Sequence, residues 1–488
     1  MSPIMLVLPI LCPLIGGLIV LRLHAQTVRR FAVVGIMVAQ LASLIPTLLH
    51  DIPTLTLLTL TESVRIVLQA DAVSRLFAVL ISLIWLFVAI FAFEYMTHEK
   101  NRERFFSFYL ITLSALIGVC FSGNLITLYM FYEMMTLCSF PLVLHTGTKK
   151  AVAAAWRYLT YSVAGAALGL LGWFVLQGYC STDLFTAGGM LDTAAAMENR
   201  ELLLGVFLVM IIGFGCKAGM FPLHAWLPIA HPEAPAPASA VLSGLITKMG
   251  ILAIIRVTYF IFGWEFLIGT WAQTAVLVLA LTTIFMGSTL ALRENILKKR
   301  LAYSTVSQVS YVIFGLMLMD ATAMEGALFQ AIFHALAKNT LFMAAGALIF
   351  KTHKTLVSDL RGVGRVYGIT MWCFTLSSLS LVGIPPTGGF AAKWMLAQGA
   401  MESGVGTLGY VGIGILMLSA LLTAGYLLSI VTNGFFPGAD FQAEGIFEKK
   451  TTPLMWIALC SLTVAALVLG MFPDIVRPAV QAVVNSLF

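Results

Sequence analysis

Fourteen long apolar segments, joined by short polar connections, make up most of this chain of 488 residues. A helix needs about 20 predominantly apolar residues to cross a bilayer. The segments lie near residues 3–21, 31–50, 74–93, 105–121, 124–144, 157–177, 201–221, 237–258, 271–291, 301–319, 326–350, 370–397, 405–431 and 452–472. Hydrophobic residues are 60% of the chain and charged residues 10%, unlike a soluble domain. The sequence therefore predicts an all-α, multi-pass membrane protein with about fourteen transmembrane helices.

The polar connections are too short to form separate domains. The longest cover residues 51–72, 178–200 and 432–451, and none can bury a core. The first apolar segment has no basic residue before it and three arginines soon after it, the reverse of a cleavable signal peptide. We therefore expect it to be retained as the first helix.

Cysteine and charge exclude several classes of site. The seven cysteines are scattered, with no C-x-x-C pair, so the sequence indicates no metal site, disulfide framework or thiolate-bound redox centre. The formal net charge of +6 comes from basic connections, and no run is dense enough to indicate nucleic-acid binding. We expect no cofactor and no metal.

Lysine and arginine are distributed unevenly between the two sets of connections. Of the 28, 24 lie in connections or at segment ends, and 19 of these follow odd-numbered segments. The remaining five follow even-numbered segments or lie at their ends, on the opposite side of the membrane. They are Arg65, Arg75, Arg200, Arg256 and Arg477. Because cytoplasmic connections carry the excess of Lys and Arg, we predict that the odd-numbered connections are cytoplasmic and that both chain ends lie on the non-cytoplasmic side.

Five ionisable residues lie deep inside the apolar segments: Glu133, Lys217, Lys248, Lys338 and Lys393. A charge at the bilayer centre costs at least about 2.5–3.5 kcal/mol, and such residues usually mark ion pathways or proton relays. A structural ion pair would account for the glutamate and one lysine. Buried pairs rarely add net stability, however, and the other charges would stay unexplained. We therefore interpret the five as functional.

Two of the segments contain glycine and proline clusters beside a buried lysine. The seventh reads GFGCKAGMFPLHAWLP around Lys217, and the twelfth reads VGIPPTGGFAAKWMLAQG around Lys393. Proline removes a backbone donor, and carbonyls freed inside a membrane must meet water or polar side chains. We expect both helices to be broken. The expected break residues are Pro222, Pro385, Pro386 and Gly388.

The two breaks lie five segments apart, and an odd offset means that copies of one unit cross the membrane in opposite directions. This is the signature of an inverted repeat with a site at broken helices. The predicted repeats are residues 101–260 (segments four to eight) and 261–431 (segments nine to thirteen). Residues 1–100 would form three N-terminal helices, and residues 432–488 a connection and the last helix.

The chain resembles the antiporter-like proton-translocating subunits shared by respiratory complex I, membrane-bound hydrogenases and multisubunit sodium/proton antiporters. The resemblance covers nearly the whole chain. Its specific strings are LITLYMFYEMMTLCSFPLV, KAGMFPLHAWLPIAHPEAPAPASAVLSGLITKMG, KKRLAYSTVSQVSYV, FHALAKNTLF and GIPPTGGFAAKW. Relatives have Glu or Lys at position 393, and Lys393 makes the chain similar to antiporter D-type and hydrogenase-linked members. Only about sixteen residues follow the last segment, so we expect an internal subunit rather than the distal one with a long lateral helix.

The resemblance implies that Glu133 and Lys217 form the charge pair that gates proton uptake and that Lys248 is the central relay. A lysine passes protons only if burial disfavours its charged form, which a nearby carboxylate restores. At an effective dielectric near 20, moving a unit charge from about 4 Å to about 8 Å changes the interaction by roughly 2 kcal/mol. Opening the pair can therefore switch the protonation of Lys217.

The resemblance also implies that His334 and Lys338 bridge to Lys393, the terminal group facing the exit half-channel. His334 and Lys338 are four residues apart and so share a helix face, and an imidazole exchanges protons near neutral pH. A histidine on a helix face is also often a packing residue. His224 and His231 either line an entry path or cap the break.

The leading hypothesis is a proton-translocating subunit of a multisubunit membrane complex, with two half-channels joined by a polar line at mid-membrane. The chain itself would carry no redox catalysis. It would act in a translocase-type oxidoreductase driven by a redox partner or, alternatively, in a multisubunit antiporter as the D-type member, with ion gradients as the source of energy.

The expected partners are other membrane subunits, lipids and H⁺. Na⁺ is the alternative ion, although a single mid-membrane carboxylate favours H⁺. By resemblance, we expect the plasma membrane of a prokaryote.

Two rival functions make different demands on the sequence. An autonomous inverted-repeat transporter would need a substrate site with several converging polar groups, whereas the buried charges here are strung out singly along the chain. A scaffold that had lost transport would be expected to lose the buried charges, and all five are present.

The charge distribution predicts where the chain ends lie. In a background without the native cysteines, Ser2→Cys should react with a membrane-impermeant maleimide added to intact cells, because the first segment starts on the non-cytoplasmic side. Lys100→Cys, in a connection predicted to be cytoplasmic, is the control and should react only after permeabilisation. The reverse labelling pattern would contradict the topology.

Overall fold

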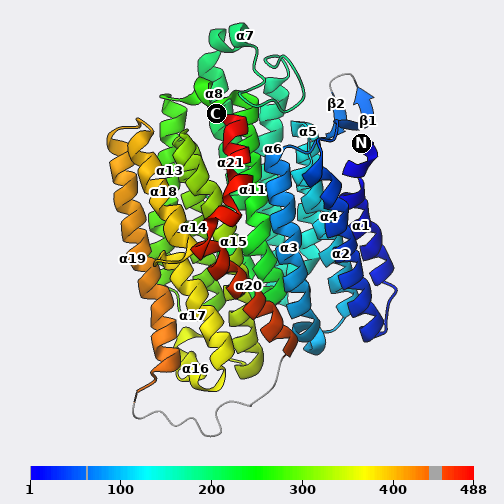
Figure 1. Cartoon of the computed structure of the whole chain (residues 1–488), viewed down its shortest axis with the longest axis vertical. Helices are drawn as coiled ribbons and strands as arrows, with labels where there is room; N and C mark the ends of the chain where they lie inside the picture. Colours follow the sequence, from blue (N-terminus) through cyan, green and yellow to red (C-terminus); the bar gives the residue numbers. More distant parts are fainter. Residues whose placement is uncertain (1, 62–63, 439–452) are drawn as a thin grey trace.

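The computed structural model describes residues 2–61, 64–438 and 453–488. Its helices run side by side along the long axis of the molecule, and both chain ends lie towards the end that carries the β-hairpin and α7 (Figure 1). Within these residues, eleven helices are long and apolar enough to cross a membrane. A multi-pass α-helical membrane protein is therefore confirmed. The count of fourteen crossings stays a prediction.

Each apolar segment that the sequence singles out overlaps a helix. The candidate membrane helices are α2 (Gln26–Leu49), α3 (Ala72–Tyr95), α4 (Arg102–Cys120), α5 (Leu125–Val143), α6 (Lys149–Leu176), α8 (Arg200–Ala218), the α10–η4 segment (Ala236–Phe262), α13 (Trp271–Arg293), α15 (Ala321–Thr352), α19 (Thr407–Phe435) and α20 (Pro453–Met471). Other helices in the bundle are shorter or more polar. These are α1 (Leu8–Val20), α14 (Leu297–Met317), α17 (Gly368–Val382) and α18 (Gly388–Glu402).

The connections contain short elements that hydropathy did not predict. The strands β1 (Leu55–Thr61) and β2 (Val64–Leu68) pair antiparallel in the connection before α3. The short helices are α7 (Thr193–Glu198), α9 (Leu227–Glu233), α12 (Trp264–Leu267) and α16 (Val363–Val366). The helix α21 (Arg477–Leu487) follows α20 and packs against α3 and α15.

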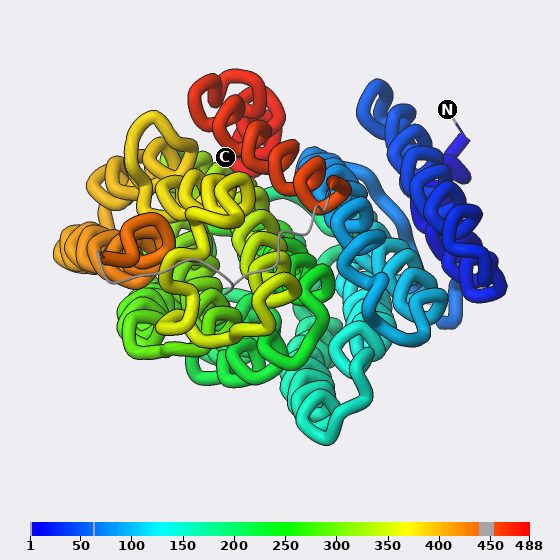
Figure 2. Tube along the Cα trace, turned by 90° about the horizontal axis from the view of Figure 1, so that it is seen from below, coloured from blue at the N-terminus to red at the C-terminus, as the bar shows by residue number. Residues whose placement is uncertain are grey.

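The 32-residue helix α15 forms the axis of the bundle, and nearly all of its side chains are buried. It packs against α14, α17, α18, α20 and the α10–η3 segment. The view along the helices shows α1 and α2 at one edge, with α20 and α21 on a neighbouring flank (Figure 2). The ionisable residues in the middle of α15, His334 and Lys338, are therefore removed from both water and lipid.

Two helices are interrupted where the sequence predicts. The first, α8, ends at Ala218, where Gly219 adopts a positive φ of 81°, and the chain becomes helical again at α9. The second, α17, ends at Val382, where Gly383 has a φ of 88°, and α18 starts at Gly388. Only glycine adopts such a conformation at little cost. The expected breaks are confirmed.

The segment around Lys248 has an irregularity that the sequence did not indicate. It consists of α10 (Ala236–Val241), the π-helical turn η3 (Leu242–Ile246), α11 (Thr247–Ile255) and a second π-helical turn, η4 (Arg256–Phe262). Such turns widen a helix locally and often occur at functional sites. Lys248 lies two residues after the first of them.

Arg256, which the sequence places near the outer end of the eighth segment, is buried within the helical segment. Its side chain is 1% exposed within η4 and forms an ion pair with Asp71, the N-cap of α3. It also donates to Ser74 Oγ at 3.0 Å, and the guanidinium carbon lies 4.4 Å from the ring centre of Phe260. Arg256 therefore ties the start of α3 to the end of the α10–η4 segment.

We predict that Arg256→Gln lowers the thermal unfolding temperature of the purified protein markedly, because removing one member of a buried ion pair costs about 3–5 kcal/mol. The matched control is Arg65→Gln. Arg65 pairs with Asp183, but its side chain is 38% exposed, and exposed pairs contribute about 0–1 kcal/mol. Scanning fluorimetry of both variants tests this, and equal unfolding temperatures would contradict it.

Candidate functional site

Lys217 is surrounded by hydroxyl groups at the end of α8. Its ammonium, in a residue only 1% exposed, donates to Thr136 Oγ1 of α5 and to Tyr158 OH and Ser162 Oγ of α6, each at 2.9 Å. The ring of Tyr158 lies 4.4 Å from the same nitrogen. Tyr158 and Ser162 are one helical turn apart and so face the lysine together. All three acceptors are neutral.

Glu133 lies one turn before Thr136 on α5, and its side chain is half-buried. In the described structure it forms no ion pair with Lys217 within 4 Å, and its Oε1 atom is buried without a hydrogen-bond partner. The two groups still interact electrostatically. The carboxylate and the ammonium are thus neighbours with a hydroxyl near both, rather than a closed pair.

The backbones that carry Lys217 and Lys248 approach very closely. A Cβ atom on Gly250 of α11 would lie 2.7 Å from the backbone nitrogen of Ala218, closer than packing allows. The glycine therefore permits α11 to touch the end of α8, so the backbones that carry the two lysines are in direct contact.

Lys248 makes the direct link to α15. Its Nζ contacts His334 Nδ1 and donates to the carbonyl of Ser243 at 3.3 Å, within the turn η3. The same carbonyl accepts from the Thr247 hydroxyl at 2.7 Å. The π-helical turn thus presents a carbonyl oxygen to side chains, and the lysine lies between this oxygen and the imidazole.

His334 and Lys338 share one face of α15, as their spacing predicts. His334 is within electrostatic reach of Lys248, Lys338 and Lys393, so it occupies the centre of the group. Lys338 donates to the Leu301 carbonyl at 3.0 Å and to Ser304 Oγ at 2.8 Å, both on α14.

A polar stripe on α14 continues from Lys338. Tyr426 of α19 donates to Ser304 Oγ at 2.8 Å and to Thr423 Oγ1 at 3.2 Å. Gln308 donates to the same Thr423 hydroxyl at 3.4 Å. Ser304 and Gln308 are four residues apart, and Tyr311 follows one turn later, so all three face one side of the helix.

Lys393 lies at the far end of this stripe. Its ammonium is 5.3 Å from the ring centre of Tyr311 and donates to the carbonyls of Leu381 and, at 2.8 Å, Val382. These carbonyls belong to the last residues of α17 and have no partner within their own helix. Lys393 of α18 therefore also caps the broken helix.

The two candidate entry histidines have different surroundings. His231 of α9 is fully buried, stacks on Phe342 with ring centres 4.7 Å apart, and has no partner for either ring nitrogen in the described residues. It is within electrostatic reach of Lys298 and Lys338. His224 is half-buried beside Phe221, and the structure does not bring it to the lysines.

Sequence reasoning missed the hydroxyl and amide groups of the site. The missed residues are Thr136, Tyr158, Ser162, Ser304, Gln308, Tyr311, Thr423 and Tyr426. The available signal was a polar residue every three or four positions inside an apolar segment. It is visible in KKRLAYSTVSQVSYV, which contains three of them. In the described parts, no three His, Cys, Asp or Glu side chains gather as metal ligands.

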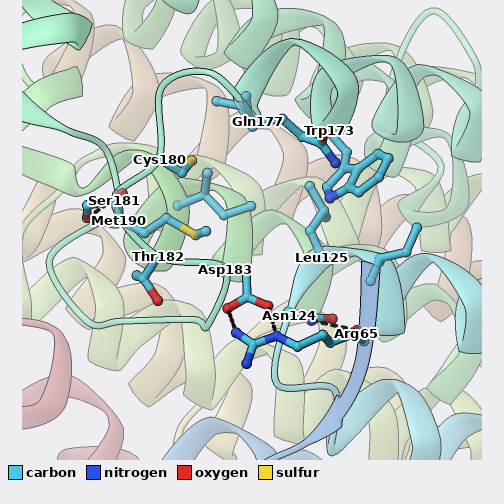
Figure 3. Close-up of a pocket in the computed structure, with 13 residues that line it drawn as sticks. Arg65, Asn124, Leu125, Trp173, Gln177, Cys180, Ser181, Thr182, Asp183 and Met190 are labelled. Atoms are coloured by element: carbon cyan, nitrogen blue, oxygen red, sulfur yellow. Dashed lines mark hydrogen bonds and ion pairs between the residues drawn. The ribbon is translucent and has the colours of Figure 1, made fainter. Parts of the chain in front are cut away.

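A polar pocket of about 410 Å³ opens at the end of the molecule that carries the β-hairpin. It is lined by the start of α5, the end of α6, β2 and the connection after α6. Figure 3 shows Arg65 and Asp183 pointing toward one another at its edge, next to Asn124. Ile126 of α5 lines the pocket and lies seven residues before Glu133, or about 10 Å along the helix.

Comparison with known proteins gives two family matches. Residues 122–423 match the transmembrane family of NADH:quinone oxidoreductase and Mrp antiporters, and residues 59–106 match the N-terminal family of complex I chain 5. The first match contains all of the buried ionisable residues described above.

Two relatives and two solved structures match over most of both chains. The N subunit of NADH-quinone oxidoreductase from Desulforudis audaxviator is 31% identical over 81% of this chain and 80% of its own. The D-type subunit of the Na⁺/H⁺ antiporter from Alkalihalophilus pseudofirmus is 29% identical over 96% and 93%. A chain of an archaeal membrane-bound sulfane sulfur reductase has the same fold, with a TM-score of 0.85 at 21% identity over 100% and 98%. A chain of the Mrp complex from Dietzia gives 0.84 at 22% over 99% and 97%.

Proposed function

Because the chain belongs to the membrane family shared by NADH:quinone oxidoreductase and Mrp antiporters, we propose that it translocates protons as one subunit of a multisubunit membrane complex. The observation that carries the proposal is the contact between Lys248 and His334. It joins two buried proton-exchanging groups across α11 and α15, at the centre of an apolar bundle.

The proposed relay runs from Glu133 and Lys217 through Lys248 and His334 to Lys338 and then Lys393. Several polar atoms along it are buried without a protein partner, including Glu133 Oε1 and His334 Nε2. Buried polar atoms need hydrogen-bond partners, and water can supply them where several polar groups converge. Hydration would connect those steps of the relay that lack a direct bond.

We propose that the two half-channels meet this relay from opposite ends. His231 is the preferred group on the cytoplasmic path, because it is within electrostatic reach of both Lys298, near the start of α14, and Lys338. The polar pocket near Ile126 is the opening on the other side, two turns from Glu133 along α5. His224 would then serve the break after α8 rather than the proton path.

The finer architecture is part of the same proposal. Helices α1, α14 and the broken pair α17–α18 would complete fourteen crossings, with both ends on the non-cytoplasmic side of a prokaryotic plasma membrane. Two inverted repeats, residues 101–260 and 261–431, are supported by the pair of breaks with similar glycine turns. The flanking parts would be residues 1–100 and 432–488.

Two sources of energy fit the family. Relatives named as D-type antiporter subunits align over 96% and 99% of this chain, which favours exchange driven by an ion gradient. A redox-driven complex is the other candidate, favoured by the relative named as a quinone oxidoreductase subunit. Identifying the proteins that co-purify with this chain decides between them, since redox subunits occur only in the second kind of complex.

We predict that Lys248→Ala slows proton movement by the assembled complex in vesicles by roughly tenfold or more, because it removes a positioned proton-transfer group. Lys217→Ala and Glu133→Gln should act in the same direction. A pH-sensitive dye inside the vesicles reports the rate under an imposed ion gradient or an added electron donor.

The matched control is Lys149→Ala at the exposed start of α6, which should keep the wild-type rate. Yield of the complex must be similar for all variants, because the relay residues contribute little packing. Wild-type proton movement in Lys248→Ala would refute the central relay.

The environment of Lys393 changes an expectation drawn from resemblance. Relatives carry Glu or Lys at this position, which makes Lys393→Glu look mild. Here, however, the ammonium donates to two backbone carbonyls, and a carboxylate cannot donate to them. We predict that Lys393→Glu loses most proton transport in the vesicle assay, while Lys393→Arg, which keeps the donors, loses less. Equal rates would contradict the role of these carbonyls.

A further inference from the structure

An apolar groove of about 610 Å³ lies between α3 on one side and α20 and α21 on the other. One stripe of α3, from Ala72 to Phe87, forms its first wall. Ile332 and Leu336 of α15 form its floor and are buried. The C-terminal helices that form the second wall cross the front of the bundle in Figure 1.

The groove is open to the surroundings of the bundle. Its rim residues Leu48, Leu83 and Ile475 are 45%, 45% and 61% exposed. In a protein that spans a membrane, exposed aliphatic side chains along a helix bundle face the hydrocarbon layer. The groove is thus a side opening into the bilayer that reaches the central helix.

The length of the groove corresponds to half the thickness of the bilayer's hydrocarbon core. Arg75 and Phe87 are twelve residues apart on α3, or about 18 Å along the helix, and half of the hydrocarbon core is about 15 Å thick. Arg75 lies near the start of α3, beside the end of α2, where the helices leave the membrane. The upper end of the groove therefore meets the headgroup layer.

Arg75 is the only charged residue that lines the groove among the described residues. Its Nη2 donates at 2.5 Å to Asp51, which is 97% exposed, and at 3.4 Å to the His50 carbonyl, whereas its Nε is buried without a partner in the described structure. An ion pair with so exposed a partner is weak. The guanidinium can therefore donate to a phosphate, which it matches in shape and charge.

We propose that this groove binds one glycerophospholipid, with its acyl chains along α3 and its phosphate on Arg75. The groove has an apolar body and one charged end, which match a phospholipid better than an apolar transmembrane helix of a partner. The proposal does not depend on proton transport. The bound lipid would contact α15, the helix that carries His334 and Lys338.

The test uses the purified complex in vesicles of phosphatidylethanolamine and phosphatidylglycerol, with a trace of phosphatidylglycerol carrying a diazirine on one acyl chain. After illumination, mass spectrometry locates the labelled residues. We expect labelling of residues 79–87 and 462–469 to exceed labelling of the lipid-exposed face of α6 around Leu171 by roughly tenfold. A cationic site at the headgroup end raises the local share of the anionic phosphatidylglycerol above its share in the bulk bilayer.

Three variants distinguish a lipid-binding site from chance contact. Ala465→Trp fills the groove and should remove most of the excess labelling, while Val464→Trp, at a neighbouring residue that is 56% exposed, should not. Arg75→Gln should lower the excess roughly tenfold by removing the charged donor. Labelling equal to that of α6, insensitivity to Ala465→Trp or Arg75→Gln, or a cross-link from the groove to another subunit would each overturn the proposal.

Discussion

The ammonium groups buried at the centre of this bundle require hydrogen-bond acceptors, because a cation moved from water into an apolar interior is costly without them. Three hydroxyls supply them at Lys217, and two backbone carbonyls supply them at Lys393. Neutral acceptors stabilise a cation less than a carboxylate does. Both the charged and the neutral lysine are therefore accessible, which a proton relay requires and a structural ion pair would prevent.

Irregular backbone provides part of this solvation. A regular helix uses its carbonyls internally, so only a helix end or a distorted turn presents them to side chains. The end of α17 presents two carbonyls to Lys393, and the π-helical turn before Lys248 presents that of Ser243. Backbone of this kind is tolerated at membrane depth only where protein or water surrounds it. The breaks and the buried charges therefore depend on one another.

The central helix α15 connects the two sites inferred from the structure. His334 and Lys338 occupy one face, toward α11 and α14. Ile332 and Leu336, displaced by two residues, occupy another face and form the floor of the apolar groove. Because α15 is buried along nearly its whole length, a change in packing at the groove acts on the same rigid element that carries the proposed relay. The groove and the proposed proton path are separated by the width of one helix.

The sequence alone determined the membrane class, the two helix breaks and the buried charges, because each is a local departure from an apolar segment. It could not determine which groups solvate these charges. Lys217 bonds to Tyr158 and Ser162, 59 and 55 residues away, and polar residues in an apolar segment look alike until the helices pack. The partner of Arg256 could not be determined for the same reason, since Asp71 lies 185 residues earlier. The position of a charged residue can be read from the sequence around it. The groups that compensate its charge are decided only by the tertiary structure.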